Sequence, residues 1–292
     1  MILTLQIWGS YALIRNIFRW LALALFAYVG AAVLARPSGW EVLKGTLVPT
    51  IEPSRDFLAI LVAIIGTTMS AYIYTWQTNV EVEEKIAQGQ SRAAERRGAS
   101  RAELRRSQLD IAVGMLFSNV IMYFIILSTG ATLHKAGHGA IETAAQAAEA
   151  LQPVAGDAAG LLFTVGIIAV GFLAVPVMTT GAAYDLCQVM GWQSTLHAKP
   201  EEATKFYLTI AAFTALAVGL NFVGFNPMKA LVYAGVVQGF STPPLLLLIM
   251  LMTGSRELMG TKVNGWPMAC LGWATVAIVF AASAALIVTL LL

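Results

Sequence analysis

The sequence predicts an all-α membrane protein that crosses the bilayer several times, and three observations support this fold class. Of the 292 residues, 58% are hydrophobic and only 12% are charged, whereas a soluble domain carries about 25% charged residues. The mean hydropathy is +0.73. The apolar residues also cluster in stretches of about 20 residues, the length that one helix needs to cross a bilayer. These features argue against a soluble enzyme, a nucleic-acid-binding protein and a disordered chain.

Seven stretches are long and apolar enough to form membrane-spanning helices. In chain order they are 17–35, 57–76, 111–133, 154–184, 206–224, 228–252 and 267–292. A shorter apolar stub, Met1 to Leu13, precedes them and is typical of the end of a membrane helix. We do not expect it to be a signal peptide, because no basic residue precedes Arg15. We therefore expect a single transmembrane domain over residues 1–292.

The basic residues alternate between the two sides of the predicted spans. The loop 81–106 contains seven of them: Lys85, Arg92, Arg96, Arg97, Arg101, Arg105 and Arg106. The positive-inside rule makes this loop cytoplasmic, and alternation then places 13 of the 18 basic residues inside. Because Glu95 and Glu103 dilute the charge, a solvated and partly helical loop is favoured. A surface for anionic lipid or nucleic acid is the alternative.

Polar residues interrupt the predicted span 57–76. An apolar half-helix leads into Gly66-Thr67-Thr68-Met69-Ser70-Ala71-Tyr72, and Gln77 follows one turn later. We expect the helix to unwind in this run. Unwound backbone in a membrane lines a cavity or is buried in protein, and its carbonyl oxygens can bind a cation. Ordinary packing of small residues between helices is an equally weighted alternative.

A second polar stretch lies in the predicted span 228–252, where Gln238 precedes Pro243 and Pro244. Two prolines remove two backbone donors, so we expect a kink beside a polar cavity, with Gln238 as an oxygen ligand. Asn119, in the span 111–133, is a further polar residue inside the membrane. The chain contains no catalytic triad, zinc-protease motif or phosphate loop, so the sequence predicts no enzyme and no cofactor.

Several stretches together resemble one transporter family. They are Gly45–Thr50, Ala63–Ser70, Trp76–Glu84, Phe117–Tyr123 and Asn226–Tyr233. Their order and spacing resemble the Nramp (natural resistance-associated macrophage protein) family of divalent metal transporters, in particular its bacterial Nramp-related branch. The resemblance implies a LeuT-type inverted repeat, in which this chain supplies the end of helix four and helices five to eleven. It also implies alternating-access transport in the inner membrane of a bacterium.

The resemblance also implies a metal site at the break in the Gly66 run. A family position that gives a backbone carbonyl falls on Thr67, and one that gives a methionine sulfur falls on Ser70, with a family histidine replaced by Tyr72. Because oxygen suits hard cations better than sulfur does, we expect Mg²⁺ or Mn²⁺ rather than Fe²⁺ as substrate. The expected metal ligands are Thr67, Ser70 and Gln238, and the expected cavity lining is Gly66, Thr68, Met69, Tyr72, Gln77 and Asn119.

One departure from the family concerns its first helices. The segment carrying the family's Asp-Pro-Gly motif has no counterpart here, so we expect residues 1–292 to be inactive alone. The missing helices would then be a partner, together with the lipid bilayer and the divalent cation. Two alternatives stay open: a non-transporting membrane subunit or pseudo-transporter, and a transporter of amino acids or amines on the same fold.

Overall fold

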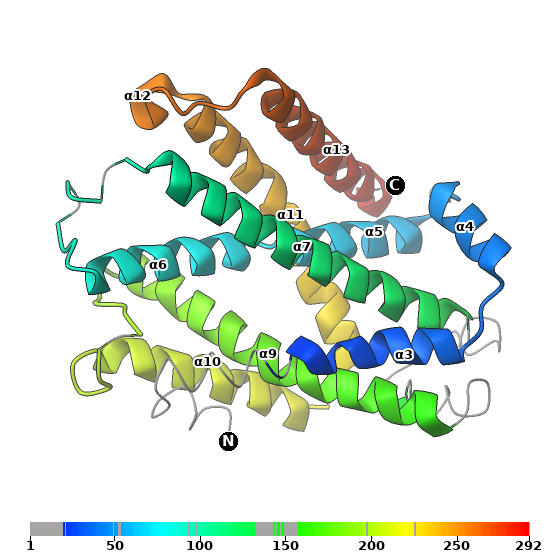
Figure 1. The fold of residues 1–292 in the computed structure, drawn as a ribbon. Helices are drawn as coiled ribbons and strands as arrows, with labels where there is room; N and C mark the ends of the chain where they lie inside the picture. Colours follow the sequence, from blue (N-terminus) through cyan, green and yellow to red (C-terminus); the bar gives the residue numbers. More distant parts are fainter. Residues whose placement is uncertain are drawn as a thin grey trace. The chain divides into compact units, whose positions relative to one another are not determined.

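The computed structural model describes residues 20–291 except 21, 49, 52–53, 93, 97, 132–142, 144, 147, 149–156, 197 and 225. The stub Met1 to Leu13 and most of the loop after the third predicted span lie outside the described residues. All regular elements among the described residues are helices (Figure 1). Five helical segments are long and apolar enough to cross a membrane: Arg55–Ala87, Arg101–Thr129, Gly160–Val189, Pro227–Gly254 and Trp266–Leu291. The predicted all-α multi-span class is therefore confirmed.

The first and fifth predicted spans differ from these five helices. Within the predicted span 17–35, the described residues form a helix over Ala22–Leu34, and α4 (Gly39–Leu47) follows it at a bend of 116°. This pair reaches the length of a span only when both parts are counted, which gives six candidates. The predicted span 206–224 corresponds to α10 (Thr204–Phe222), of which Thr204–Leu220 is an apolar helical segment shorter than the five. Composition located these two segments, but it does not report where a helix bends.

The described residues form two compact units, which we describe separately. The first contains 1–50 and 83–228, and the second contains 51–82 and 229–292. In the first unit, α3 (Phe26–Leu34) packs against both α7 (Arg101–Thr129) and α9 (Asp157–Val189) (Figure 1). Tyr28 and Phe163 meet edge to face there, with ring centroids 5.3 Å apart. Burial of such aromatic pairs stabilises helix packing beyond their area alone.

The second unit contains α5 (Arg55–Thr68), most of α6 (Ala71–Ala87), α11 (Pro227–Gly254), α12 (Arg256–Met259) and α13 (Trp266–Leu291). Leu58, Val62 and Leu286 form its apolar core, where α5 packs against α13. The Ser54 hydroxyl caps α5 by accepting from the Phe57 amide at 3.3 Å. Local capping and burial of one helix face thus position the segment that follows Thr68.

Candidate functional site

The helical ladder between α5 and α6 is interrupted at Met69 and Ser70. Met69 N donates to Ile65 O at 2.9 Å, and the ladder resumes with Ile73 N donating to Ser70 O at 3.1 Å. The two helices follow each other along nearly one line (Figure 1). The expected interruption is therefore present inside the predicted run, but it is confined to its middle, because Gly66 to Thr68 remain helical and α6 begins at Ala71.

The Ser70 hydroxyl is the centre of a buried group of oxygens. It lies 2.7 Å from Gly66 O, 3.0 Å from Thr67 O and 3.2 Å from Gln238 Oε1, and the side chain is fully buried. A hydroxyl carries one proton, so it donates to one acceptor at a time. The three expected metal ligands, the Thr67 carbonyl, Ser70 and Gln238, are thus brought together with more acceptors than donors.

Three glycines bring α11 against α5 at this level. A Cβ added to Gly66 would lie 2.2 Å from Gly239 N, and one added to Gly239 would lie 2.4 Å from Val62 O. A Cβ on Gly235 would meet the Cβ of Ala63 at 3.1 Å. Gly235 and Gly239 are four residues apart, the spacing of small residues that lets membrane helices approach closely. This contact holds Gln238 beside Ser70, and it means that Gly66 packs against α11 instead of unwinding.

The two prolines lie inside α11, which is helical from Pro227 to Gly254, and the expected kink there stays a prediction. Pro243 has no amide hydrogen to offer the Gly239 carbonyl. The hydroxyl of Ser283, on α13, donates to that carbonyl instead at 3.3 Å. Thr242 Oγ1 lies 3.2 Å from Met69 O and 2.8 Å from Gln238 O, and its side chain is fully buried. Side chains of two helices, α11 and α13, thus supply donors where proline and the interruption remove them.

This arrangement can hold a cation through neutral oxygens. Gly66 O, Thr67 O and Gln238 Oε1 share the single Ser70 proton, so lone pairs remain in a buried setting where an unpaired acceptor is costly. If the Gln238 amide is turned, Nε2 donates to Ser70 and the two carbonyls still share one donor. Among the described residues, no group of three or more histidine, cysteine, aspartate or glutamate side chains could hold a metal. Any binding here therefore relies on carbonyl, hydroxyl and amide oxygens.

The remaining residues of the expected cavity lining have other contacts. Thr68 Oγ1 donates to Ile64 O at 2.6 Å, and Gln77 Nε2 donates to Glu81 Oε1 at 3.0 Å. The Asn119 amide donates to Met115 O at 2.8 Å on an exposed part of α7. Tyr72 is half-buried in the first turn of α6. A side-chain hydrogen bond joins Tyr72 to Ser70, whereas the described hydrogen bonds of the other three are within their own helices. The place of all four in a cavity stays a prediction.

Sequence reasoning missed a buried carboxylate at the other end of α6. Glu83 is 7% exposed and accepts from Tyr184 Oη at 2.6 Å. The Leu196 amide donates to both of its oxygens, at 3.0 and 3.2 Å. Residues 81–84 contain three acidic residues, Glu83 among them, and Lys85 follows, a pattern typical of a solvated helix end. Nothing in the spacing of these charges distinguishes the buried one.

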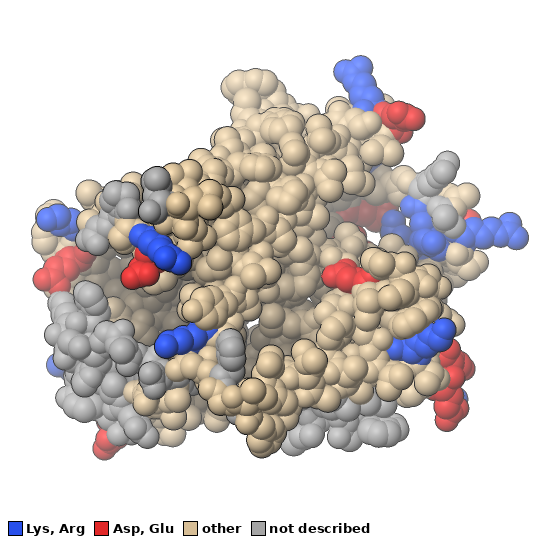
Figure 2. All heavy atoms as spheres, turned by 180° about the vertical axis from the view of Figure 1, so that it is seen from behind, with Lys and Arg blue, Asp and Glu red and all other residues tan. Residues whose placement is uncertain are grey.

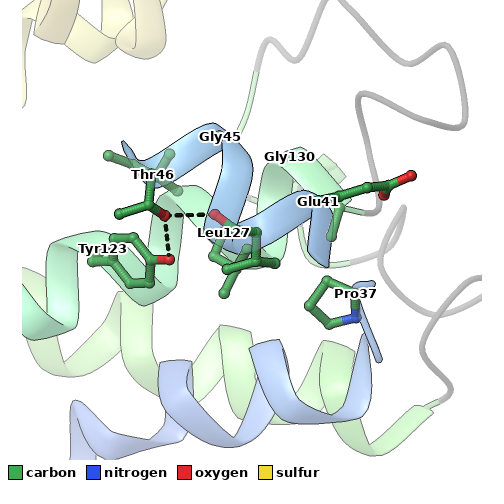
Figure 3. A pocket seen from close by; sticks show the side chains of 10 residues that line it. Pro37, Glu41, Gly45, Thr46, Tyr123, Leu127 and Gly130 are labelled. Carbon is green, nitrogen blue, oxygen red and sulfur yellow. Dashed lines mark hydrogen bonds between the residues drawn. The ribbon is translucent and has the colours of Figure 1, made fainter. Parts of the chain in front are cut away.

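A cavity of about 340 Å³ lies elsewhere, between α4 and the end of α7. Figure 3 shows Thr46 and Tyr123 side by side there, and their hydroxyl oxygens are 2.9 Å apart. Thr46 also donates to Val42 O at 2.7 Å. In Figure 3 the Glu41 side chain extends away from this pair. The lining is mostly apolar and includes none of the predicted site residues.

Comparison with known proteins agrees with the expected family. The family model described as natural resistance-associated macrophage protein-like matches residues 1–289. A divalent metal cation transporter MntH of Yersinia enterocolitica is 26% identical over 297 residues, covering 100% of this chain and 66% of its own length. An MntH of Vibrio campbellii is 26% identical, with 99% and 63% covered. One of Caldanaerobacter subterraneus is 25% identical, with 88% and 57% covered. The chain thus spans about three fifths of the length of these relatives.

Proposed function

This chain belongs to the natural resistance-associated macrophage protein-like (Nramp) family, and from that premise we propose that it contributes to the transport of divalent metal cations across a bacterial inner membrane. The family consists of transporters, so the expectation that the chain is not an enzyme is confirmed. The curated relatives are named divalent metal cation transporters. The cation is a substrate of this function, and the mechanism is alternating access in a LeuT-type fold.

The observation that carries the proposal is the oxygen group around Ser70. Its hydroxyl faces three acceptors with one proton, and it is fully buried at a helix interruption inside a candidate membrane span. Interrupted membrane helices are where transporters bind their ions. We assign the Thr67 carbonyl, Ser70 and Gln238 as metal ligands of this chain.

The chemistry of these ligands supports a preference for hard cations. Carboxamide, hydroxyl and carbonyl oxygens suit Mg²⁺ and Mn²⁺, whereas a thioether would favour softer metals. Mg²⁺ gives up its water reluctantly, and the small Ser70 side chain leaves space for a partly hydrated ion. We therefore propose Mg²⁺ or Mn²⁺ over Fe²⁺. Neutral oxygens offset dehydration poorly, so residues 1–292 alone should bind and transport weakly.

Exchange of Ser70 for methionine tests this assignment. The chain is joined to the remaining part of a curated relative and reconstituted in liposomes, and uptake of Mg²⁺, Mn²⁺ and Cd²⁺ is compared. Ser70→Met should raise the preference for Cd²⁺ over Mg²⁺ by about tenfold, because a sulfur replaces an oxygen ligand. Ser241→Met is the matched control, since Ser241 is exposed on α11. An unchanged metal preference in folded Ser70→Met protein would contradict the assignment.

A smaller change at Gln238 gives a second test of the same site. Gln238→Ala removes one oxygen without adding bulk, and it should weaken Mn²⁺ uptake by about tenfold while expression is retained. Uptake at the wild-type level would make Gln238 a packing residue. Uptake of an amino acid or amine that ignores divalent ions would instead favour a different substrate on the same fold.

A further inference from the structure

We propose that Arg92, Arg101, Arg105 and Arg106 form a binding surface for the headgroups of anionic phospholipids. We call these four residues the arginine surface. They lie where the connection after α6 leads into the first turns of α7. This proposal concerns lipid recognition and does not depend on which cation the chain carries.

Positive charge is concentrated in this segment of the first unit. Residues 85–106 contain seven basic and two acidic side chains, a net charge of +5, whereas the whole chain has a net charge of +2. The rest of the chain is therefore net negative. In Figure 2, blue side chains gather at the edge of the molecule over the segment that joins α6 to α7. Such a cluster attracts anionic headgroups within about 10 Å at 0.1 M salt.

The arginines are available, whereas the nearby acids are engaged. Arg101, Arg105 and Arg106 are exposed, and within the described part of the chain no hydrogen bond or ion pair holds their guanidinium groups. Glu103 accepts from Ser100 N at 2.6 Å in the capping box that starts α7. Glu95 accepts from the Arg92 backbone amide at 3.0 Å. Both carboxylates are thus directed to backbone amides.

The length of α7 places the arginines at the level of lipid headgroups. Its 29 residues extend about 43 Å at 1.5 Å per residue, whereas the hydrocarbon core is about 30 Å thick. The apolar part begins at Ile111, so the turns from Arg101 to Asp110 project beyond it. Arg105 and Arg106 then lie within about 10 Å of the hydrocarbon boundary. At this depth, arginine side chains reach phosphate groups while their stems stay on apolar surface.

The same segment lacks what single-stranded nucleic acid would use. Proteins that bind it combine basic grooves with aromatic side chains on which bases stack. Residues 85–106 contain no phenylalanine, tyrosine or tryptophan. Together with the position next to a membrane span, this composition favours lipid.

Lipid selectivity measured by electron paramagnetic resonance tests the proposal. The whole chain is reconstituted in bilayers, and association of spin-labelled phosphatidylglycerol is compared with that of spin-labelled phosphatidylcholine. We expect a preference for phosphatidylglycerol that falls about fivefold for each arginine removed, so R105Q/R106Q should lose about 25-fold. The preference should also shrink in 1 M salt. R105K/R106K keeps the charge and should keep most of the preference.

The matched control is R256Q/K262Q, which removes two basic residues at and after α12. If this control lowers the preference as much as R105Q/R106Q does, the effect is one of net charge and the arginine surface is not a site. The proposal is also overturned if folded R105Q/R106Q retains the wild-type preference. Tighter binding of a single-stranded oligonucleotide, lost in the same variant, would assign the surface to nucleic acid instead.

Discussion

The two ends of α6 each have a buried polar side chain, but they differ in the balance of hydrogen-bond donors and acceptors around it. Before its first turn, the Ser70 hydroxyl is surrounded by three oxygen acceptors and has one proton to give. In its last turns, the Glu83 carboxylate receives the Tyr184 hydroxyl and the Leu196 amide. Both side chains are buried, at 0% and 7% exposure. Acceptors are in surplus at the first end and are matched by donors at the second.

The difference shows that burial and charge do not by themselves indicate a cation site. A carboxylate that already accepts several hydrogen bonds has its lone pairs occupied, and its charge is stabilised by those donors. Carbonyls that compete for one hydroxyl proton retain lone pairs that a cation can use. We therefore interpret Glu83 as a structural group, which connects α6 with α9 and the segment after it. The Ser70 end is the one that we propose for ion binding.

The largest effect is expected from a substitution that separates α11 from α5 at the Ser70 end. Gly239→Leu places a side chain where a Cβ alone would lie 2.4 Å from the Val62 carbonyl oxygen. The backbone of α5 cannot move aside as a flexible side chain can. We therefore expect the free energy of unfolding to fall by about 3 kcal/mol or more. Thermal unfolding in detergent and the monodisperse fraction on gel filtration measure the effect.

Gly114→Leu is the control for this change, since a Cβ there meets nothing within 4 Å. It should unfold at nearly the wild-type temperature. A Gly239→Leu protein as stable as the control would show that α11 does not depend on this close contact. The close contact could then not be what holds Gln238 beside Ser70.

Removal of the Glu83 carboxylate tests the other end of α6, where donors match the acceptors. Glu83→Ala leaves the Tyr184 hydroxyl and the Leu196 amide without their acceptor, and both are buried or half-buried. We expect a loss of about 3 kcal/mol in stability, because unsatisfied buried donors are costly. The neighbouring Glu84 is exposed, so Glu84→Ala should change stability by less than about 0.5 kcal/mol. Unfolding temperatures of the two variants give the comparison.

A different result would reverse the roles of the two ends. If Glu83→Ala kept its stability but lost cation uptake in liposomes, the carboxylate would belong to the transport machinery. The interpretation of Glu83 as a structural group would then be wrong.

The sequence was informative about the Ser70 end because the signals there are local. A glycine followed by hydroxyl residues inside an apolar run predicts an interruption, and the interruption lies at Met69 and Ser70. The partner Gln238 was found because a polar amide inside a span has few alternatives to a buried contact. The exact position of the break was not predictable, because it depends on how closely Gly66 packs against Gly239.

The Glu83 end could not be predicted, because its donors come from distant parts of the chain. Tyr184 and Leu196 are more than 100 residues away in sequence. Four neighbouring charges gave no periodic signal that one of them is buried. The bend between α3 and α4 was missed for a similar reason, since hydropathy reports the length of an apolar run and not its direction. In contrast, the four-residue spacing of Gly235 and Gly239 was visible in the sequence and indicates close helix packing.

The smallest expected effect tests whether a side-chain hydroxyl replaces a missing backbone donor. At α11 the Gly239 carbonyl lacks an amide partner because of Pro243, and Ser283 donates to it at 3.3 Å. Ser283→Ala should therefore cost about 1 kcal/mol in stability. In a Pro243→Ala background the new amide can donate to Gly239, so the same Ser283→Ala change should cost less than about 0.5 kcal/mol. Unfolding of the four proteins of this double-mutant cycle measures the coupling. If Ser283→Ala lowers stability equally in both backgrounds, Ser283 does not replace the donor that proline removes. Oxygen–oxygen distances of this kind could then no longer show that the acceptors around Ser70 outnumber its donors.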